Sequence, residues 1–380
     1  MNLVMKRYFI LLFFVGFVVS FAYAQTSDDS SLFQNAQNFR NDKQYENAIT
    51  ELNKVLEIDP DHVRALNEKG SIRLIQGKYV KALQNFEKAI QLEPKNIIAL
   101  NGYGTSQYFL DQYEDALDSF NAVLRIDGTN TDALIGSGKI LLKNQQNDDA
   151  ILFFNIVLER EPNNIAALVA KANALSNTNQ YDDAINLFDK VIQLDLDNIE
   201  ALIGKGQVYL ELEEYNLARD VFTDALEIDT NNITAILGMA ELNFLEEKYI
   251  KADQFYDKVL STDPDNLEAL IGKANVLENL GRNDDALRFY DEALEVDPDN
   301  LEASNGRNLV LENEVNSSLD LILIITLIGS ITSVFSFIVM MIKIKENKKL
   351  QERVIIADEQ IEELVDKFMK KTTGHQNKKL

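Results

Sequence analysis

Small apolar residues recur along this chain with a strict period of 34 residues. Two series of alanines hold their phase through eight repeats, and no insertion or deletion interrupts either series. A fixed period of this length is typical of stacked-repeat proteins, in which each unit packs only on its neighbours. The first series is Ala65, Ala99, Ala133, Ala167, Ala201, Ala235, Ala269 and Ala303, and the second is Ala48, Ala82, Ala116, Ala150, Ala184, Ala218, Ala252 and Ala286.

The unit over residues 63–96 shows what each repeat contains. Apolar or small residues lie three or four positions apart in both halves of the unit, which predicts two helices with one buried face each. Gly77 lies between the halves and can end the first helix with a positive φ. Junctions such as Asp59-Pro60-Asp61 stop the second helix with proline and offer Asx oxygens as caps for the next. Each unit is therefore predicted to be a helical hairpin whose core comes from stacking. The apolar positions are Leu66, Gly70 and Leu74, then Ala82, Phe86, Ala89 and Ile90.

Two apolar segments flank the repeats. The N-terminus has basic residues at Lys6 and Arg7, an apolar stretch over 8–21 and a small-x-small pattern over 22–24, which predicts a secretory signal peptide over 1–24. A polar linker over 25–30 follows. Residues 321–342 carry no charge and match the ~20 residues that a membrane-spanning helix needs. Lysines follow this segment, so we expect the repeats outside the membrane and a cytoplasmic amphipathic tail over 343–380. The alternatives are an uncleaved N-terminal anchor and a buried core helix.

Composition narrows the chemistry. The chain has 61 acidic and 37 basic residues, and a net charge of −24 disfavours nucleic acid as a partner. Cysteine is absent and only two histidines occur, so we expect no disulfide, no metal site and no cofactor. The sequence contains no phosphate-binding loop and no recognisable catalytic motif. We therefore expect a protein that is not an enzyme.

The repeat closely resembles the tetratricopeptide repeat family. The small position of that family's pattern is filled by Gly70 and its equivalents, the inter-helix alanine by the second alanine series, and the aromatic position by Phe86 and its equivalents. The five prolines share one phase, with Gly128, Leu196 and Thr230 as departures. The resemblance implies an all-α, right-handed superhelical α-solenoid of eight repeats, closed by a capping helix and linker over 303–318. We expect the repeats at 31–64, 65–98, 99–132, 133–166, 167–200, 201–234, 235–268 and 269–302.

The resemblance also implies a peptide-binding groove lined by the first helices. Transferring the family's groove positions gives an apolar set and, one turn further on, a mainly polar set. One interpretation is an apolar stripe edged by amides that grips a partner segment; the other is that the aliphatics only pack between adjacent first helices. The apolar set is Ile135, Val169, Ile203, Leu237 and Ile271, with Phe33, Asn67 and Asn101 at the matching earlier positions. The second set is Lys139, Asn173, Gln207, Glu241 and Asn275.

Three further features leave alternatives open. Mid-helix glycines such as Gly102 and Gly204 each cost ~1 kcal/mol against alanine, which indicates either close helix approach or groove flexibility. The Asx-rich junctions fit helix capping better than a calcium loop, because they lack its glycine and distal glutamate. Asn232 and Asn316 begin N-glycosylation sequons.

We predict a protein–protein interaction scaffold of the cell envelope, anchored by one membrane span, with an extracytoplasmic groove that binds peptide segments of a protein partner. One alternative is an assembly or secretion factor for pili or a surface layer. Another is a signal-transducing receptor that uses the tail. The tail carries an a/d pattern from Leu350 to Phe368, which is compatible with self-association through a short coiled coil or with an amphipathic helix on the inner leaflet.

Overall fold

The computed structural model describes residues 30–328, and for Glu314 and residues 316–328 it gives the backbone alone. Within that range every regular element is an α-helix, which confirms the all-α solenoid of about eight repeats plus a closing helix. The expected signal peptide, nearly all of the expected linker and the expected tail lie outside the described residues. The chain divides into two compact units, one up to Thr230 and one from Asn231.

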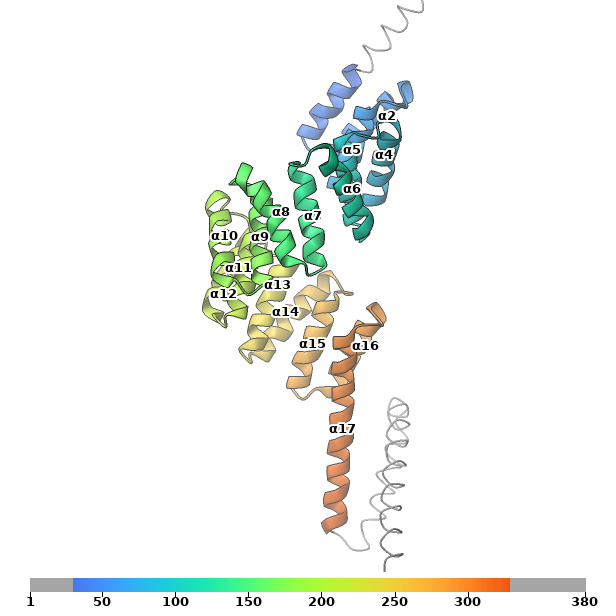
Figure 1. Cartoon of the computed structure of the whole chain (residues 1–380). Coiled ribbons are helices and arrows are strands. Elements are labelled where there is room, and N and C mark those ends of the chain that lie inside the picture. The colour runs from blue at the N-terminus through green and yellow to red at the C-terminus, as the bar shows by residue number, and fades with distance from the viewer. Residues whose placement is uncertain (1–29, 329–380) are drawn as a thin grey trace, which may run out of the picture. The chain divides into compact units, whose positions relative to one another are not determined.

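Unit 1 is a stack of helical hairpins (Figure 1). A helix over residues 30–41 precedes α2 and forms the first hairpin with it. Each first helix contacts its own second helix, the preceding second helix and the neighbouring first helices. The elements are α2 (Tyr45–Ile58), α3 (Val63–Ile75), α4 (Tyr79–Leu92), α5 (Ile97–Tyr108), α6 (Tyr113–Ile126), α7 (Thr131–Lys143), α8 (Asn147–Arg160), α9 (Ile165–Asn177), α10 (Tyr181–Leu194), α11 (Ile199–Glu211) and α12 (Tyr215–Ile228).

Unit 2 continues the pattern with two hairpins and a long closing helix. Its elements are α13 (Ile233–Leu245), α14 (Tyr249–Thr262), α15 (Leu267–Asn279), α16 (Asn283–Val296) and α17 (Leu301–Ile328). α17 runs without interruption through all of residues 303–318, where a capping helix followed by a linker was expected, because no proline or glycine follows Gly306 before Gly329. None of the helices described over 30–328 is long and apolar enough to cross a membrane. Most of the predicted span over 321–342 lies beyond that range.

Capping asparagines start the first helices. The Asn198 side chain accepts a hydrogen bond from the Ala201 backbone N–H at 3.0 Å, and the same bond recurs at six other asparagines and at His62. The cap therefore stands three residues before each alanine of the first series, and the helices begin two residues before the repeat boundaries expected from those alanines. Asn198 also donates to Asp195 at 3.0 Å. The Asx-rich junction thus satisfies the backbone of a helix end.

Each hairpin turns through one residue with a positive φ. Gly77 and Gly281 take this position with φ of 67° and 71°, as glycine does at helix C-termini. Six other residues occupy the same phase, although they are not glycine and pay for the left-handed conformation. They are Lys43, Asp111, Gln145, Asn179, Glu213 and Glu247, with φ between 57° and 59°.

The core consists of aromatic rings that reach between neighbouring first helices. Phe86, on a second helix, is fully buried against Gly70 of its own repeat and Gly102 of the next. A Cβ on either glycine would overlap the ring, and the same holds where Phe188 meets Gly204. The mid-helix glycines therefore make room for an aromatic ring, which accounts for them through packing.

Candidate binding face

Each first helix leaves one narrow stripe open to solvent. On α5 the stripe consists of Ile98, Thr105 and Phe109, and on α7 of Asp132, Lys139 and Lys143. The spacings of seven and four residues correspond to two turns and one turn of helix, so the three side chains lie on one face, and the remaining faces pack on neighbouring helices. We call the stripes of the first helices in one unit its first-helix face.

The first-helix face of unit 1 contains a cavity of about 570 Å³. Its lining comes from the first helices α3, α5, α7 and α9 and from Phe120 on α6, and it includes Leu74, Ile98, Tyr108, Phe109, Ile135 and Lys139. Ile98 is 62% exposed and Phe109 is 49% exposed. Large apolar side chains that line a cavity and remain in contact with water are typical of a binding surface.

Aromatic contacts hold the exposed Phe109 ring in place. It stacks on Tyr79 with ring centroids 4.7 Å apart and meets Tyr108 edge-on at 5.4 Å. Tyr108 in turn meets Tyr113 at 5.6 Å. Burial, then the charges of Asp111 and Glu200, raise the pKa of Tyr108, so its hydroxyl remains a donor at neutral pH. The apolar edge of the cavity is therefore ordered before any partner arrives.

Polar groups complete the lining. Asn101 donates to the Asn130 side-chain oxygen at 2.9 Å, and that oxygen also accepts from the Ala133 backbone N–H at 3.1 Å. The Asn101 oxygen itself is buried without a hydrogen-bond partner. Lys139 forms no hydrogen bond or ion pair with any residue that the structure describes. The cavity thus combines apolar walls with the cation Lys139 and the carboxylate Asp132, which also lines it.

The two residue sets expected from the sequence have different environments. In the apolar set, Val169, Ile203, Leu237 and Ile271 are 2%, 8%, 6% and 5% exposed. These four side chains therefore pack between helices, as the second interpretation of the apolar set expects. Of the five residues in that set, only Ile135 lines the cavity. In the second set Gln207 and Glu241 are exposed, while Lys139, Asn173 and Asn275 are half-buried. The structure therefore brings Ile135 and Lys139 together at the cavity and places the second set on the first-helix faces of the two units.

Sequence reasoning missed Ile98 and Phe109, the two most exposed apolar residues of the cavity. For Ile98 the repeat itself holds a signal. Ile98 stands where most other first helices carry a polar residue, such as Arg64, Asp132 or Glu200, and only Ala166 is apolar among the others. A large apolar residue at such a position indicates a surface kept for something other than the core. Phe109 carries no such signal, because Ile75 and Leu245 occupy the same position in other repeats.

Ion pairs tie second helices to the first helix of the next repeat. Asp189 contacts Lys205 at 2.6 Å, Asp257 contacts Lys273 at 2.7 Å, and Asp291 contacts Arg307 at 2.5 Å. The three pairs share one phase of the period. Among the described residues, no group of three or more His, Cys, Asp or Glu side chains is placed to hold a metal ion.

Models of known families match several parts of the chain. One tetratricopeptide repeat model matches residues 110–174 and 243–307. Two others match residues 63–96 and 30–62. Residues 143–225 match a model described as subunit 3 of the anaphase-promoting complex, or cyclosome.

Solved structures share the fold at low sequence identity. The crystal structure of a tetratricopeptide repeat protein from Parabacteroides merdae is similar, with a TM-score of 0.56 and 17% identity, over 66% of this chain and 99% of that chain. The APC/C hetero-tetramer Cut9–Hcn1 has a TM-score of 0.57 and 14% identity, over 70% of this chain and 52% of that one. Yeast Tom70 has a TM-score of 0.51 and 18% identity, over 73% and 60%. No curated protein matches the sequence significantly.

Proposed function

Because the chain is a tetratricopeptide repeat protein, we propose that it is a protein-binding scaffold whose cavity in unit 1 holds an apolar segment of a partner protein. Repeats of this family are protein–protein interaction scaffolds and are typically non-enzymatic. The observation that carries the proposal is the exposure of Ile98 and Phe109 in the lining of that cavity.

The chemistry of the cavity suits a short segment with large apolar side chains. Burying a side chain of the size of Ile98 or Phe109 contributes about 1.5–3 kcal/mol. Lys139 provides a cation for a backbone carbonyl or a carboxylate of the segment, and such a charged hydrogen bond fixes its orientation. The stacking of Tyr79 on Phe109 lowers the entropy that binding would otherwise cost.

We further propose that the scaffold belongs to the cell envelope. The predicted signal peptide over 1–24 and the predicted span over 321–342 support this placement, with the repeats on the extracytoplasmic side and the tail in the cytoplasm. The basis for this proposal is the sequence alone.

A pair of matched variants tests the cavity. Ile98→Asp places a charge in the lining, whereas Leu152→Asp makes the same change at a residue on α8 that is 60% exposed and does not line the cavity. We expect the envelope partner that crosslinks to the wild-type chain to bind the Ile98→Asp chain at least tenfold more weakly and the Leu152→Asp chain unchanged. Unchanged binding by a folded Ile98→Asp chain would contradict the proposal.

A further inference from the structure

The first-helix face of unit 2 differs in chemistry from that of unit 1. Glu268 on α15 and Glu302 on α17 occupy the same position in successive repeats, and the two helices are in contact. Both side chains are exposed, and neither forms a hydrogen bond or an ion pair with the described part of the chain. Two neighbouring carboxylates are therefore left without a counter-charge.

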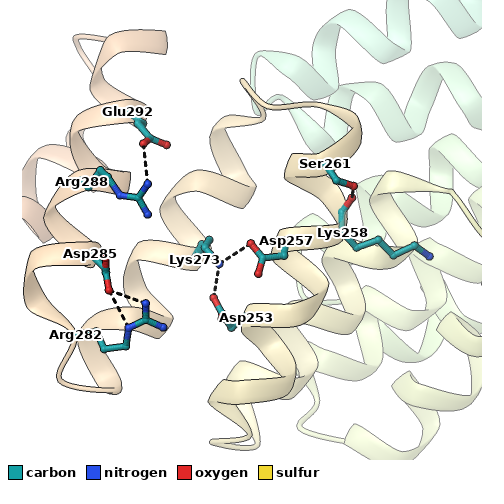
Figure 2. A network of polar contacts seen from close by, with 9 residues as sticks. All are labelled: Asp253, Asp257, Lys258, Ser261, Lys273, Arg282, Asp285, Arg288 and Glu292. Carbon is teal, nitrogen blue, oxygen red and sulfur yellow. Dashed lines mark hydrogen bonds and ion pairs between the residues drawn. The ribbon is translucent and has the colours of Figure 1, made fainter.

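The cations nearby in sequence are all engaged elsewhere. Lys273 is 6% exposed and contacts both Asp253, at 2.5 Å, and Asp257 (Figure 2). The three arginines over residues 267–313 pair with other acids: Arg282 with Asp285, Arg288 with Glu292 and Arg307 with Asp291. No cation of α15, α16 or the side-chain-described part of α17 thus serves Glu268 or Glu302.

A buried tyrosine, Tyr256, has its hydroxyl close to the helix that carries Glu268. Tyr256 fills the core position that is phenylalanine in α4, α6, α8, α10 and α12, and it is 6% exposed. Its hydroxyl lies beside Gly272, one turn along α15 from Glu268, where a Cβ would come within 2.5 Å of it. The hydroxyl makes no hydrogen bond to a described residue. By contrast, the Tyr290 hydroxyl donates to the Asn275 oxygen at 2.5 Å.

We propose that Glu268, Glu302 and the Tyr256 hydroxyl bind the ammonium or guanidinium group of a lysine or arginine in a basic segment of the partner, separate from the apolar segment that the unit 1 cavity holds. This inference rests on the proposed function and specifies the chemistry of the partner. Charge complementarity selects a cation, and a basic side chain fits better than a metal ion, because the described residues hold no group of three or more metal-ligating side chains.

The electrostatics of Glu268 agree with such a site. Dehydration by the surrounding protein, then the charge of Glu302, raise the pKa of Glu268. The two carboxylates therefore oppose each other's ionisation in the free protein. A bound cation relieves both effects, so its binding shifts the Glu268 pKa down again and weakens when the medium is acidified through that pKa.

Displayed random dodecapeptides, selected on the full-length chain in detergent, provide the probe. Each selected peptide is measured against the Glu268→Gln/Glu302→Gln chain and against Glu295→Gln/Asp299→Asn, which removes the same charge from exposed positions outside this face. We expect a class of peptides to bind the first variant at least tenfold more weakly and the second unchanged. Replacing the lysine or arginine of such a peptide with norleucine should cause the same loss in the wild type and no further loss in the first variant.

A milder variant tests the hydroxyl. Tyr256→Phe restores the residue that other repeats use at this position, so the fold is retained, and we expect binding of the same peptides to weaken severalfold. The proposal is overturned if no selected peptide depends on Glu268 and Glu302, or if the norleucine peptides bind equally well. Calcium binding that disappears in the double variant would also overturn it, by assigning the site to a metal ion. The Ile98→Asp chain reports separately on the cavity in unit 1, so the two proposals fail independently.

Discussion

At the scale of single residues, the repeat depends on a contact between an aromatic ring and a missing side chain. A Cβ at position 204 would lie only 2.5 Å from the nearest carbon of the Phe188 ring, which is too close for two carbon atoms. Glycine in mid-helix costs ~1 kcal/mol against alanine, and the close packing of the ring offsets this cost. This explains why the glycine row shares the period of the aromatic row.

Gly204→Ala tests the contact. Overpacking of a closed core costs about 1–3 kcal/mol, which exceeds the gain in helix propensity, so we expect a lower urea midpoint for the full-length chain. Gly128→Ala is the control, because a Cβ there meets only the Leu124 carbonyl oxygen at 3.6 Å. We expect the urea midpoint of the control not to fall. If the midpoint of Gly204→Ala rose instead of falling, the Phe188 ring would have moved aside to make room for the new Cβ.

Glu268 provides a second prediction at this scale. Its raised pKa means that the folded state disfavours the ionised carboxyl, so folding is weakened above that pKa and regains stability as acid protonates the group. In the absence of a partner, Glu268→Gln should therefore raise the urea midpoint at pH 7. This advantage should shrink as the pH falls through the pKa of Glu268. A lower midpoint at pH 7 would indicate that Glu268 supports the fold.

Residue-level prediction from the sequence had a clear limit. Periodicity identified the positions that face other helices. The groove positions transferred from the family pattern did not indicate which of these side chains are exposed to solvent. Val169 and Ile271 are buried, while Ile98, at a position that is polar in most other repeats, is exposed. Burial depends on the neighbouring helix as well as on the residue, and the sequence of one repeat does not contain that neighbour.

At the scale of helices, the hairpins start at capping asparagines, and two of these caps have an additional role. Asn96 and Asn130 each accept a bond from an asparagine on the preceding first helix, Asn67 and Asn101 respectively. In the first helices from α7 to α15 that partner position is aliphatic. Early repeats therefore link their first helices by side-chain amides, and later repeats link them by apolar packing.

Asn130→Ala and Asn198→Ala separate the two roles. Loss of a cap costs ~1 kcal/mol, and this should describe Asn198→Ala. Asn130→Ala also leaves the buried Asn101 amide without an acceptor, which adds about 1–3 kcal/mol. We expect urea unfolding to show the larger loss for Asn130→Ala, and equal losses would exclude an energetic role for the Asn101 bond.

Element boundaries followed from the sequence better than the site did. The period of 34 residues predicted hairpins, and the helices begin two residues before the expected boundaries because each cap precedes its alanine by three. The backbone conformation of the turns could not be predicted as well. Six of them adopt a positive φ at residues such as Lys43 and Glu213 without a glycine to indicate it, because the packing of the two helices imposes the conformation.

At the scale of the molecule, the first-helix faces of the two units differ in chemistry. Unit 1 has an apolar cavity with the unpaired Lys139, whereas unit 2 has the unpaired carboxylates Glu268 and Glu302. A single uniform ligand would not satisfy both. We therefore expect a partner with an apolar segment and a separate basic segment, and the net charge of −24 favours the approach of a basic protein.

Membrane attachment is the second prediction at this scale. The 22 uncharged residues over 321–342 are long enough to span a bilayer. We expect the full-length chain to stay in the membrane pellet after extraction with alkaline carbonate. The same chain lacking residues 321–342 should move to the supernatant. Extraction of the full-length chain by alkali would contradict the proposed anchor.

The most direct measurement of the central claim is photo-crosslinking in intact cells from a photoreactive amino acid placed at position 98 or 109. Position 152, equally exposed but not part of the cavity lining, is the control. We expect an adduct of the same mass from positions 98 and 109 and no such adduct from position 152. Adducts from position 152 alone, or none from positions 98 and 109, would contradict the claim that the cavity in unit 1 holds a partner.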